Sequence, residues 1–568
     1  METSHFNVPE PMWSDPDWEA TLISEPNVFL EPQADIKPVE SSDDDYLDSS
    51  RSALRRRMFD SFAKSIFDGH HSRKFLPNNS LSRLVTEDSV RLELEDRRSQ
   101  HDPTVVELVP YICSKATKLF ATAVYMKCTR KTLLQVMDQL HDNDFTDEDL
   151  PMQLEDGKSK WTALGWSKDQ MEDFYDAQWA FLAPFFERLE LYYEFSSDCI
   201  LPFLDLETKD VGVFVFSSIT KGRIHEDHIS QSLQTSNECV AIKQVSRQST
   251  AEGKSWIAEH RALCDVNALN HPHSVRAIAA FSKGYDGYFI FPWADGGNLR
   301  DFWGQNKRLS LDKDSVTESV LQLRGLFGAL RSVHSTSSFL HGNLKPENIL
   351  VFPNEKSSIG HLKISEWGLA RKHLEQTKMR HGETTTRHGT RVYQESEPSA
   401  VHTANSRLDG VSNDVWALGC VALEHLVWLL YGEKEHERFI APLVKAGIVG
   451  FYKRAGERSM MSPAVVRWME HMSTQFPPGT GVGDLVEVIR TKMLAIDLPP
   501  ERGTMHPDEV LKRPYQANAY EIVSSLRTIL HRLERDDNYC FSDRPYDGLR
   551  GLDDHPATHE ASSSGEPN

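Results

Sequence analysis

The chain has 568 residues, of which 39% are hydrophobic and 10% aromatic, and its formal net charge at pH 7 is −21. Because a single hydrophobic core stops growing at roughly 250 to 300 residues, we expect at least two folded units. The negative charge argues against nucleic acid or an anionic membrane as a partner, since both are bound through basic surfaces.

Seven cysteines are scattered along the chain, with no Cys-x-x-Cys pair and no His at ligand spacing near them. This pattern predicts a reduced, intracellular protein without structural zinc, located in the cytoplasm or, alternatively, in the nucleus. The amino-terminal stretch METSHFNVPEPMWSD lacks the basic start and apolar core of a signal peptide, so export is not predicted.

Residues 1–50 are rich in Pro, Ser, Asp and Glu, and residues 538–568 are similarly polar. Neither segment can bury enough apolar surface to offset the entropy of ordering, which costs about 1 to 2 kcal/mol per residue. We therefore expect both ends of the chain to be disordered.

Residues 51–203 are predicted to form a mostly α-helical region. Within 105–140, apolar residues recur at three- and four-residue steps, which places them on one helical face. A second helix-length block, 171–193, carries aromatic residues that helical periodicity explains as core, and no titratable cluster in this region has catalytic or ligand spacing. The apolar sets are Val106, Val109, Ile112, Ala116, Leu119, Phe120 and Ala123 in the first block, and Phe174, Trp179, Phe181, Phe185, Phe186 and Leu189 in the second.

A short strand is predicted at residues 239–243, Cys-Val-Ala-Ile-Lys, and a helix-like stretch follows at 255–263. An apolar strand that ends in Lys is common and indicates little by itself. Further on, a helix is predicted to begin at a capping box formed by Ser315 and Glu318, and it leads into the sequence LHGNLKPENIL at 340–350.

Strand-like residues follow that stretch, then Glu-Trp-Gly at 366–368 and Asp-Val-Trp-Ala-Leu-Gly at 414–419. The apolar run 415–431 is long, but Glu424 and His425 interrupt it, so it is predicted to be a buried helix and not a membrane span.

In this order, these motifs resemble those of eukaryotic protein kinases, whose catalytic loop reads His-Arg-Asp-Leu-Lys-Pro-Glu-Asn. The resemblance implies an α+β, two-lobed protein-kinase fold, with a small β-rich N-lobe and a larger helical C-lobe, preceded by the helical region. The domain would span 204–537, with the N-lobe at 204–291, the hinge at 292–297 and the C-lobe at 298–537.

The region 51–203 resembles the helical segment that precedes the kinase domain in a group of filamentous-fungal kinase-like proteins. The likeness lies in Phe75-Leu76-Pro77 and in Asp-Glu-Asp-Leu-Pro at 147–151, and it implies no defined activity.

The family resemblance also implies ATP and Mg²⁺ as cofactors and a protein as partner or substrate. The catalytic positions would be Asn343 and Lys345, and the metal would be held by Asn348 and Glu366. Asp414 would brace the catalytic loop, and Glu397 would pair with Arg513. The residues expected to bind ATP are Lys243 with its ion-pair partner Glu259, Gly212 of the glycine loop, the gatekeeper Phe291, the hinge residues Pro292 and Ala294, and Asn348.

Four positions depart from the family pattern. Asn343 replaces the catalytic Asp and cannot act as a base, which typically costs about 10² to 10⁴ in rate. Glu366 replaces the metal-binding Asp and carries its charge one methylene further, where a misplacement on the order of 1 Å can cost about 10². The glycine loop retains only Gly212, with Phe214 and Ser217 at its other glycine positions, and Gly342 replaces an Arg that would read a phosphate on the run Thr384-Thr385-Thr386.

Three hypotheses follow. In the first, the chain is a pseudokinase that acts as a scaffold or allosteric partner in intracellular signalling. In the second, it is a weakly active serine/threonine kinase, since Lys243, Glu259, Lys345 and Asn348 are retained and Lys345-Pro346-Glu347-Asn348 fits the Ser/Thr class. In the third, the helical region carries the principal function.

Overall fold

The computed structural model describes most of the chain between residues 53 and 541. The described residues are 53–67, 73–95, 102–126, 130–153, 160–187, 192–207, 217–231, 239–247, 250–306, 309–336, 340–367, 392–393, 406–445, 450–455, 458–495 and 515–541. The predicted disordered ends, 1–50 and 538–568, therefore lie almost entirely outside the described residues.

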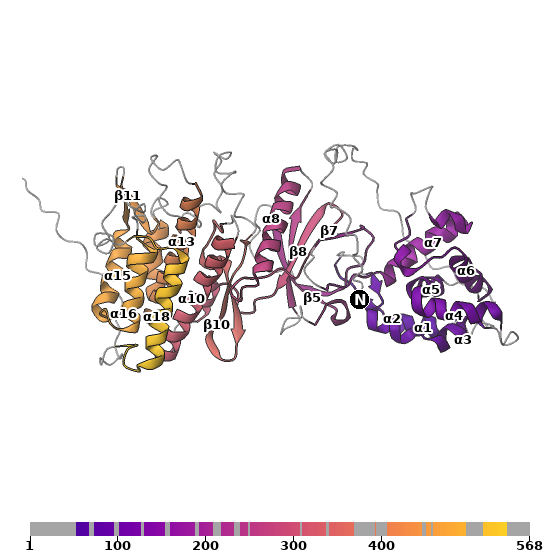
Figure 1. Cartoon of the computed structure of the whole chain (residues 1–568), viewed down its shortest axis with the longest axis horizontal. Coiled ribbons are helices and arrows are strands. Elements are labelled where there is room, and N and C mark those ends of the chain that lie inside the picture. Colours follow the sequence, from indigo (N-terminus) through magenta and orange to yellow (C-terminus); the bar gives the residue numbers. More distant parts are fainter. Residues whose placement is uncertain are drawn as a thin grey trace, which may run out of the picture. The chain divides into compact units, whose positions relative to one another are not determined.

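Short helices form a hydrophobic core of their own in the first part of the chain (Figure 1). Residues such as Met58, Val90, Ile112, Phe120 and Met137 are fully buried in it. The helices are α1 (Ala53–Ser61), α2 (Asn78–Leu84), α3 (Glu87–Leu94), α4 (Pro103–Lys115), α5 (Thr117–Tyr125), α6 (Arg130–Asp142) and α7 (Lys168–Gln178), with a two-stranded pair β1 (Ala63–Lys64) and β2 (Lys74–Phe75).

The stretch 105–140 is divided into three helices, α4, α5 and α6. Within this stretch, the prediction that Val106 lies on the apolar face is wrong, because its side chain is 52% exposed while that of Val105 is buried. The break between α4 and α5 is stabilised by Asp147, whose carboxylate accepts hydrogen bonds from the backbone N–H groups of Lys118 and Leu119 at 3.0 Å. These N–H groups lie in the first turn of α5, where they have no partner within the helix.

The predicted helical block 171–193 is also shorter than expected. Helix α7 ends at Gln178, a 3₁₀ turn covers Trp179–Phe181, and an isolated bridge then pairs Phe186 with Ile229. Pro184 prevents a helix from running through the rest of the predicted block, since proline disfavours the helical conformation of the residue before it and cannot donate a backbone hydrogen bond.

A six-stranded sheet follows, in the order β3-β7-β8-β6-β5-β4, and only its β3–β7 pair is parallel. Figure 1 labels three of its strands, β5, β7 and β8. Its first strand comes from residues that we assigned to the helical region, so the sheet begins before the predicted boundary at residue 204. The strands are β3 (Tyr192–Phe195), β4 (Phe203–Glu207), β5 (Ser217–Ile224), β6 (Cys239–Ser246), β7 (Ala279–Lys283) and β8 (Asp286–Pro292).

A hydrophobic cluster connects this sheet to the helical region. Phe75, Trp179 and Phe186 pack there with Phe203 and Phe281 of the sheet. In addition, the Ser65 hydroxyl donates a hydrogen bond to the Leu201 carbonyl at 2.7 Å. Helix α8 (Thr250–Leu269) packs against the sheet through a smaller cluster that contains Trp256 and Phe289.

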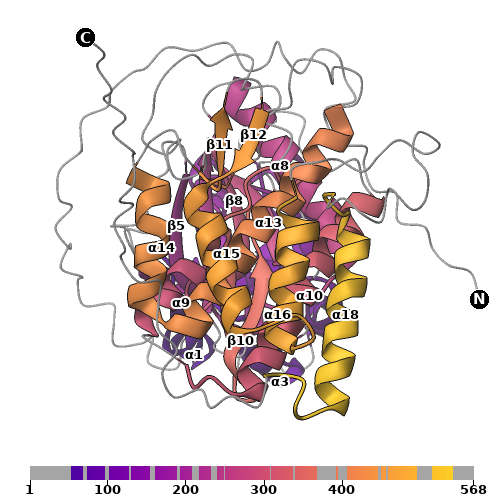
Figure 2. The same ribbon diagram turned by 90° about the vertical axis from the view of Figure 1, so that its left-hand side faces the viewer.

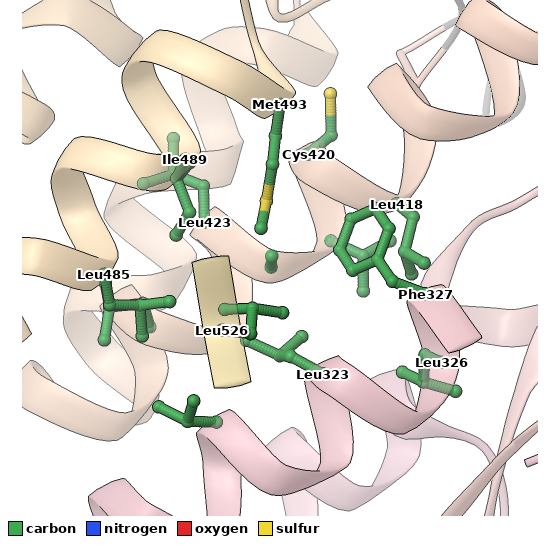
Figure 3. Close-up of a cluster of buried hydrophobic side chains, with 14 of the residues drawn as sticks. Leu323, Leu326, Phe327, Leu418, Cys420, Leu423, Leu485, Ile489, Met493 and Leu526 are labelled. Carbon is green, nitrogen blue, oxygen red and sulfur yellow. The ribbon is translucent and has the colours of Figure 1, made fainter. Parts of the chain in front are cut away.

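Helices dominate the rest of the chain, and Figure 2 shows α15, α16 and α18 side by side with α10 and α13 next to them. The core side chains come from several helices that are far apart in sequence, as Leu323, Leu418, Leu485, Met493 and Leu526 show in Figure 3. The helices are α9 (Leu299–Gln305), α10 (Lys313–Thr336), α13 (Ser406–Tyr431), α14 (Glu433–Lys445), α15 (Pro463–Gln475), α16 (Gly481–Val488) and α18 (Ala519–Arg535), with two hairpins, β9 (Ile349–Asn354) with β10 (Ser357–Ile364) and β11 (Tyr452–Ala455) with β12 (Arg458–Met461).

Helix α13 is the buried helix that the run 415–431 predicted. Its segment Val411–Tyr431 is long and apolar enough to cross a membrane, but 94% of the most apolar window is buried inside the protein. Helix α10 begins earlier than predicted, because the reciprocal cap joins Asp312 and Ser315 and does not join Ser315 and Glu318.

Candidate active site

Lys243, on strand β6, lies between two carboxylates. Its Nζ is 2.6 Å from Glu259 Oε1 on α8 and 3.0 Å from Glu366 Oε2. The side chains of Lys243 and Glu259 are only 7% and 8% exposed. Burial by itself lowers the pKa of Lys243, but the two carboxylates outweigh it and raise that pKa above its usual value. The predicted Lys243–Glu259 pair is therefore present, and Lys243 carries a permanent positive charge.

Glu366 has a backbone conformation that is uncommon for a residue with a side chain. Its φ is 59°, in the left-handed region, which costs on the order of 1 to 3 kcal/mol and concentrates at functional sites. The flanking residues hold this turn, since the Ser365 hydroxyl donates to the Asn348 carbonyl at 3.0 Å and the Trp367 indole donates to the Ile364 carbonyl at 3.0 Å. As a result, the Glu366 carboxylate is directed at Lys243.

The loop at 340–348 is anchored by one buried carboxylate. Asp414 is 1% exposed, and its two oxygens accept the backbone N–H groups of His341 at 2.8 Å and Gly342 at 2.7 Å. The ring nitrogen Nε2 of His334 lies 3.0 Å from the same carboxylate. Gly342 has a φ of 69°, which glycine adopts without the steric cost of a side chain. The predicted bracing role of Asp414 is confirmed by these contacts.

His341 connects this loop to Glu366. Its ring nitrogen Nε2 lies 2.7 Å from the Ser365 carbonyl and acts as the donor, while Nδ1 accepts the Asn343 backbone N–H at 3.3 Å. Burial lowers the pKa of His341, which favours this neutral form. The imidazole also packs edge-to-face against Trp367, with ring centroids 5.0 Å apart. The catalytic loop and the turn at Glu366 are thus held as one unit.

Asn343 stands where the kinase pattern has an Asp. Its carbonyl accepts a hydrogen bond from the Asn348 side chain at 2.7 Å, whereas its own side-chain oxygen Oδ1 is buried without a hydrogen-bond partner among the described residues. An amide oxygen can accept a hydrogen bond from a hydroxyl and so orient it, but it cannot remove the proton. Lys345 directly precedes the short 3₁₀ turn Pro346–Asn348, and its side chain makes no capping hydrogen bond to that turn.

The hinge begins where strand β8 ends, at Pro292, and α9 starts after it at Leu299. Phe291, the residue before Pro292 on β8, pairs across the sheet with Ala241 of β6. The carbonyl of Ala294 accepts the Gly297 N–H at 3.0 Å, and the Ala294 N–H makes no hydrogen bond within the described residues. The predicted hinge therefore has a free main-chain donor at Ala294, the position expected to contact adenine.

The oxygen donors fit Mg²⁺ in kind. Because the Asn348 Nδ2 group donates to the Asn343 carbonyl, the Oδ1 atom of Asn348 is left to act as a ligand. Together with the Glu366 carboxylate it supplies the hard oxygens that Mg²⁺ prefers. Among the described residues, no group of three His, Cys, Asp or Glu side chains converges as a metal site.

Several predicted residues lie outside the described residues. They are Gly212 and Phe214 of the glycine loop, Gly368 after Trp367, the run Thr384-Thr385-Thr386, and the pair Glu397 and Arg513. Their roles stay predictions.

One ionic network near the catalytic loop was not predicted. Arg300 contacts Glu347 at 3.3 Å and also contacts the fully buried Glu424 and the Tyr393 hydroxyl. Glu424 in turn accepts from Tyr393 at 2.8 Å and lies 2.8 Å from His436. The network explains how Glu424 is accommodated in an apolar helix, but no sequence spacing relates residues more than a hundred positions apart.

The comparisons with known proteins agree with this geometry. Residues 228–470 match the family model of the protein kinase domain. The chain is 30% identical over 184 residues to CBL-interacting serine/threonine-protein kinase 20 of Arabidopsis thaliana, covering 32% of this chain and 38% of that protein. It is 29% identical over 196 residues to the serine/threonine-protein kinase cds1 of Schizosaccharomyces pombe, covering 33% of this chain and 38% of that protein.

The match thus spans little more than a third of the length of these relatives. A solved structure, Rad53 1-466 in complex with AMP-PNP, overlaps with a TM-score of 0.34 at 17% identity, covering 57% of this chain and 64% of that one. The matched residues are those that build the site described above. The domain that contains residues 228–470 therefore belongs to the eukaryotic protein kinase family.

Proposed function

We propose that the protein binds ATP with Mg²⁺ in its kinase domain and transfers phosphate poorly or not at all, so that it works as a pseudokinase scaffold or allosteric partner in signalling. The single observation that carries this proposal is the contrast within one site. Lys243 is fixed between Glu259 and Glu366, whereas the base position holds the neutral amide of Asn343.

The binding half of the proposal depends on charge and on the hinge. Lys243 is a permanent cation held at a defined place by two carboxylates, as the phosphates of a nucleotide require. Mg²⁺, when bound by Glu366 and Asn348, supplies electrostatic stabilisation of phosphate oxygens. Ala294 offers its backbone N–H to the adenine edge.

The transfer half depends on two losses. Without a carboxylate at residue 343, the proton of a substrate hydroxyl has no base, which typically costs about 10² to 10⁴. Glu366 already forms an ion pair with Lys243 at 3.0 Å, and its longer side chain changes where it can hold a metal. If independent, the two effects lower the rate by roughly 10⁴ to 10⁶, although the effects of residues that act as a unit do not simply add.

The alternative function is that of a weakly active serine/threonine kinase. It is favoured by the retention of a negative charge at residue 366 and by the Asn348 amide, which is bonded to the catalytic loop. The serine/threonine class of the relatives supports the same view.

Nucleotide binding measured by calorimetry, with ATP alone and with ATP and Mg²⁺, tests the proposal. We expect binding by the wild type and its loss in Lys243→Ala. Lys434→Ala removes an exposed lysine of α14 and serves as the matched control, which should bind as the wild type does. Failure of the wild type to bind ATP under any of these conditions would refute the binding half.

The location inside the cell and the partner are also proposals. Cytoplasm or nucleus and a protein partner suit a signalling scaffold, and the acidic chain, with its net charge of −21, is a poor match for nucleic acid or an anionic membrane.

A further inference from the structure

We propose that strand β3 is a positioning element that sets helix α8, and with it Glu259, through the aromatic ring of Tyr192. This inference rests on the proposed nucleotide site and adds a route by which the amino-terminal half of the chain can control it. Tyr192 is assigned as a positioning residue, since it acts on the site through its contacts with Trp256 and His260 of α8.

Strand β3 is an addition at the edge of the sheet. It has four residues and pairs in parallel with β7, with Tyr192 opposite Ala280 and Glu194 opposite Ser282. Successive side chains of a strand point to opposite faces. Accordingly, Tyr192 lies on the α8 side, whereas Tyr193 packs on the other side against Phe186 and Phe195.

Tyr192 is the outer member of an aromatic stack on α8. Its ring centroid lies 5.4 Å from that of Trp256 and 6.0 Å from that of His260, and its hydroxyl lies 3.2 Å from the Ser282 hydroxyl. Trp256 and His260 are themselves stacked, with centroids 5.7 Å apart and planes at 8°. The Tyr192 ring therefore contacts two successive turns of α8, while the strand that carries it is held to the sheet by backbone pairing with β7.

On the side that faces the sheet, the stack packs closely against strand β8. Trp256 is 1% exposed and stacks on Phe289 of β8 at 5.5 Å. A Cβ at Gly287 would lie 2.2 Å from the indole nitrogen, so only glycine leaves room for Trp256 at this place. The indole is thus enclosed between β8 and the Tyr192 ring, and loss of that ring removes one of its walls.

Glu259 lies directly on this part of the helix. It follows Trp256 by three residues and precedes His260, so it is about 4.5 Å along the axis from Trp256 at the helical rise of 1.5 Å per residue. Towards its carboxyl end, α8 is held separately by Ala262 and Val266, which pack into the hydrophobic core formed by α10, α13 and the later helices. A shift of the amino-terminal half of α8 would therefore move Glu259 away from Lys243, and a displacement on the order of 1 Å is enough to weaken such a site.

The topology makes β3 a suitable point of control. A short strand at a sheet edge opens at lower free energy than the centre of a core. Because β3 follows helices α1 to α7 in the chain, an event that displaces it would be transmitted to the nucleotide site.

The test compares Tyr192→Ala with Tyr193→Ala, which removes a ring of equal size from the opposite face of the same strand. Hydrogen exchange of the α8 amides is measured without nucleotide, and the Kd of Mg²⁺–ATP is measured separately. We expect Tyr192→Ala to accelerate exchange in α8 and to weaken binding about 5-fold or more, the lower end of ordinary coupling between sites. Tyr193→Ala should leave α8 exchange at the wild-type rate and change the Kd less than 2-fold.

Tyr192→Phe keeps the ring and removes only the hydroxyl, so it should restore both readouts to wild-type values. Equal effects of Tyr192→Ala and Tyr193→Ala, or unchanged α8 exchange in Tyr192→Ala, would overturn the inference. If the wild type binds no nucleotide, the proposed function fails, whereas α8 exchange still decides whether β3 positions the helix.

Discussion

The backbone of the catalytic loop and its reacting side chains follow the kinase pattern to different degrees. The backbone retains a full set of anchors, in which Asp414 accepts from His341 and Gly342 and the His341 ring reaches Ser365. At the reacting positions, Asn343 is an amide and Glu366 a longer carboxylate. The loop backbone can therefore keep its conformation while the side chain at residue 343 loses its charge, because Asn has nearly the shape of Asp.

The largest effect is expected from removing the anchor. Asp414→Ala leaves the backbone N–H groups of His341 and Gly342 buried without an acceptor, so we expect the free energy of unfolding to fall by about 3 to 5 kcal/mol in urea denaturation. The exposed Glu470→Ala on α15 is the control and should change it by less than about 0.5 kcal/mol. A loss below about 1 kcal/mol for Asp414→Ala would show that the anchor does not hold the loop.

An intermediate effect is expected from pH, through a buried histidine on the same helix as Asp414. Burial, together with nearby His436, lowers the pKa of His425 from 6.5 to about 4. The neutral ring accepts from the Trp303 indole at 3.1 Å and lies 3.1 Å from the Ser319 hydroxyl. Below pH 6.5 the unfolded chain binds the proton and the folded chain does not, so stability is full above pH 6.5 and is lost as the pH falls towards 4.

At pH 5 this loss amounts to about 2 kcal/mol relative to pH 7 for one such group. In urea denaturation of His425→Asn, the loss of unfolding free energy between pH 7 and pH 5 should be smaller than in the wild type by that amount. His425→Gln serves as a second variant. The other buried histidines are present in every protein compared, so the difference isolates residue 425. An identical pH dependence in wild type and both variants would contradict the assigned neutral state.

The smallest effect concerns Gly342, which has a φ of 69°. Gly342→Ala places a side chain in the left-handed region and should lower the free energy of unfolding by about 1 kcal/mol. Gly304→Ala in helix α9 is the matched control, because a Cβ there meets no atom within 4 Å and alanine favours a helix, so stability should rise. Changes of the same sign in both variants would argue against a strained loop backbone.

The sequence predicted those parts of the site that rest on contiguous motifs. The Lys243–Glu259 pair, the bracing by Asp414 and the buried helix α13 are present as expected. Elements that depend on distant contacts were not predicted, such as the parallel addition of β3 to β7 and the Arg300–Glu424 network, since pairing partners about 90 and 124 positions apart leave no local pattern. The start of α10 was missed because one residue, Asp312, decides it.

Phosphate transfer is the measurement that tests the central claim most directly. Purified wild type, Lys243→Ala and Asn343→Asp are incubated with Mg²⁺–ATP and a mixture of Ser/Thr peptides, and transferred phosphate is counted. We expect ATP binding by the wild type, transfer slower by roughly 10⁴ to 10⁶ than the turnover of about 1 to 100 per second typical of kinases, and a gain of transfer in Asn343→Asp. Wild-type transfer within that ordinary range, abolished by Lys243→Ala, would contradict this expectation.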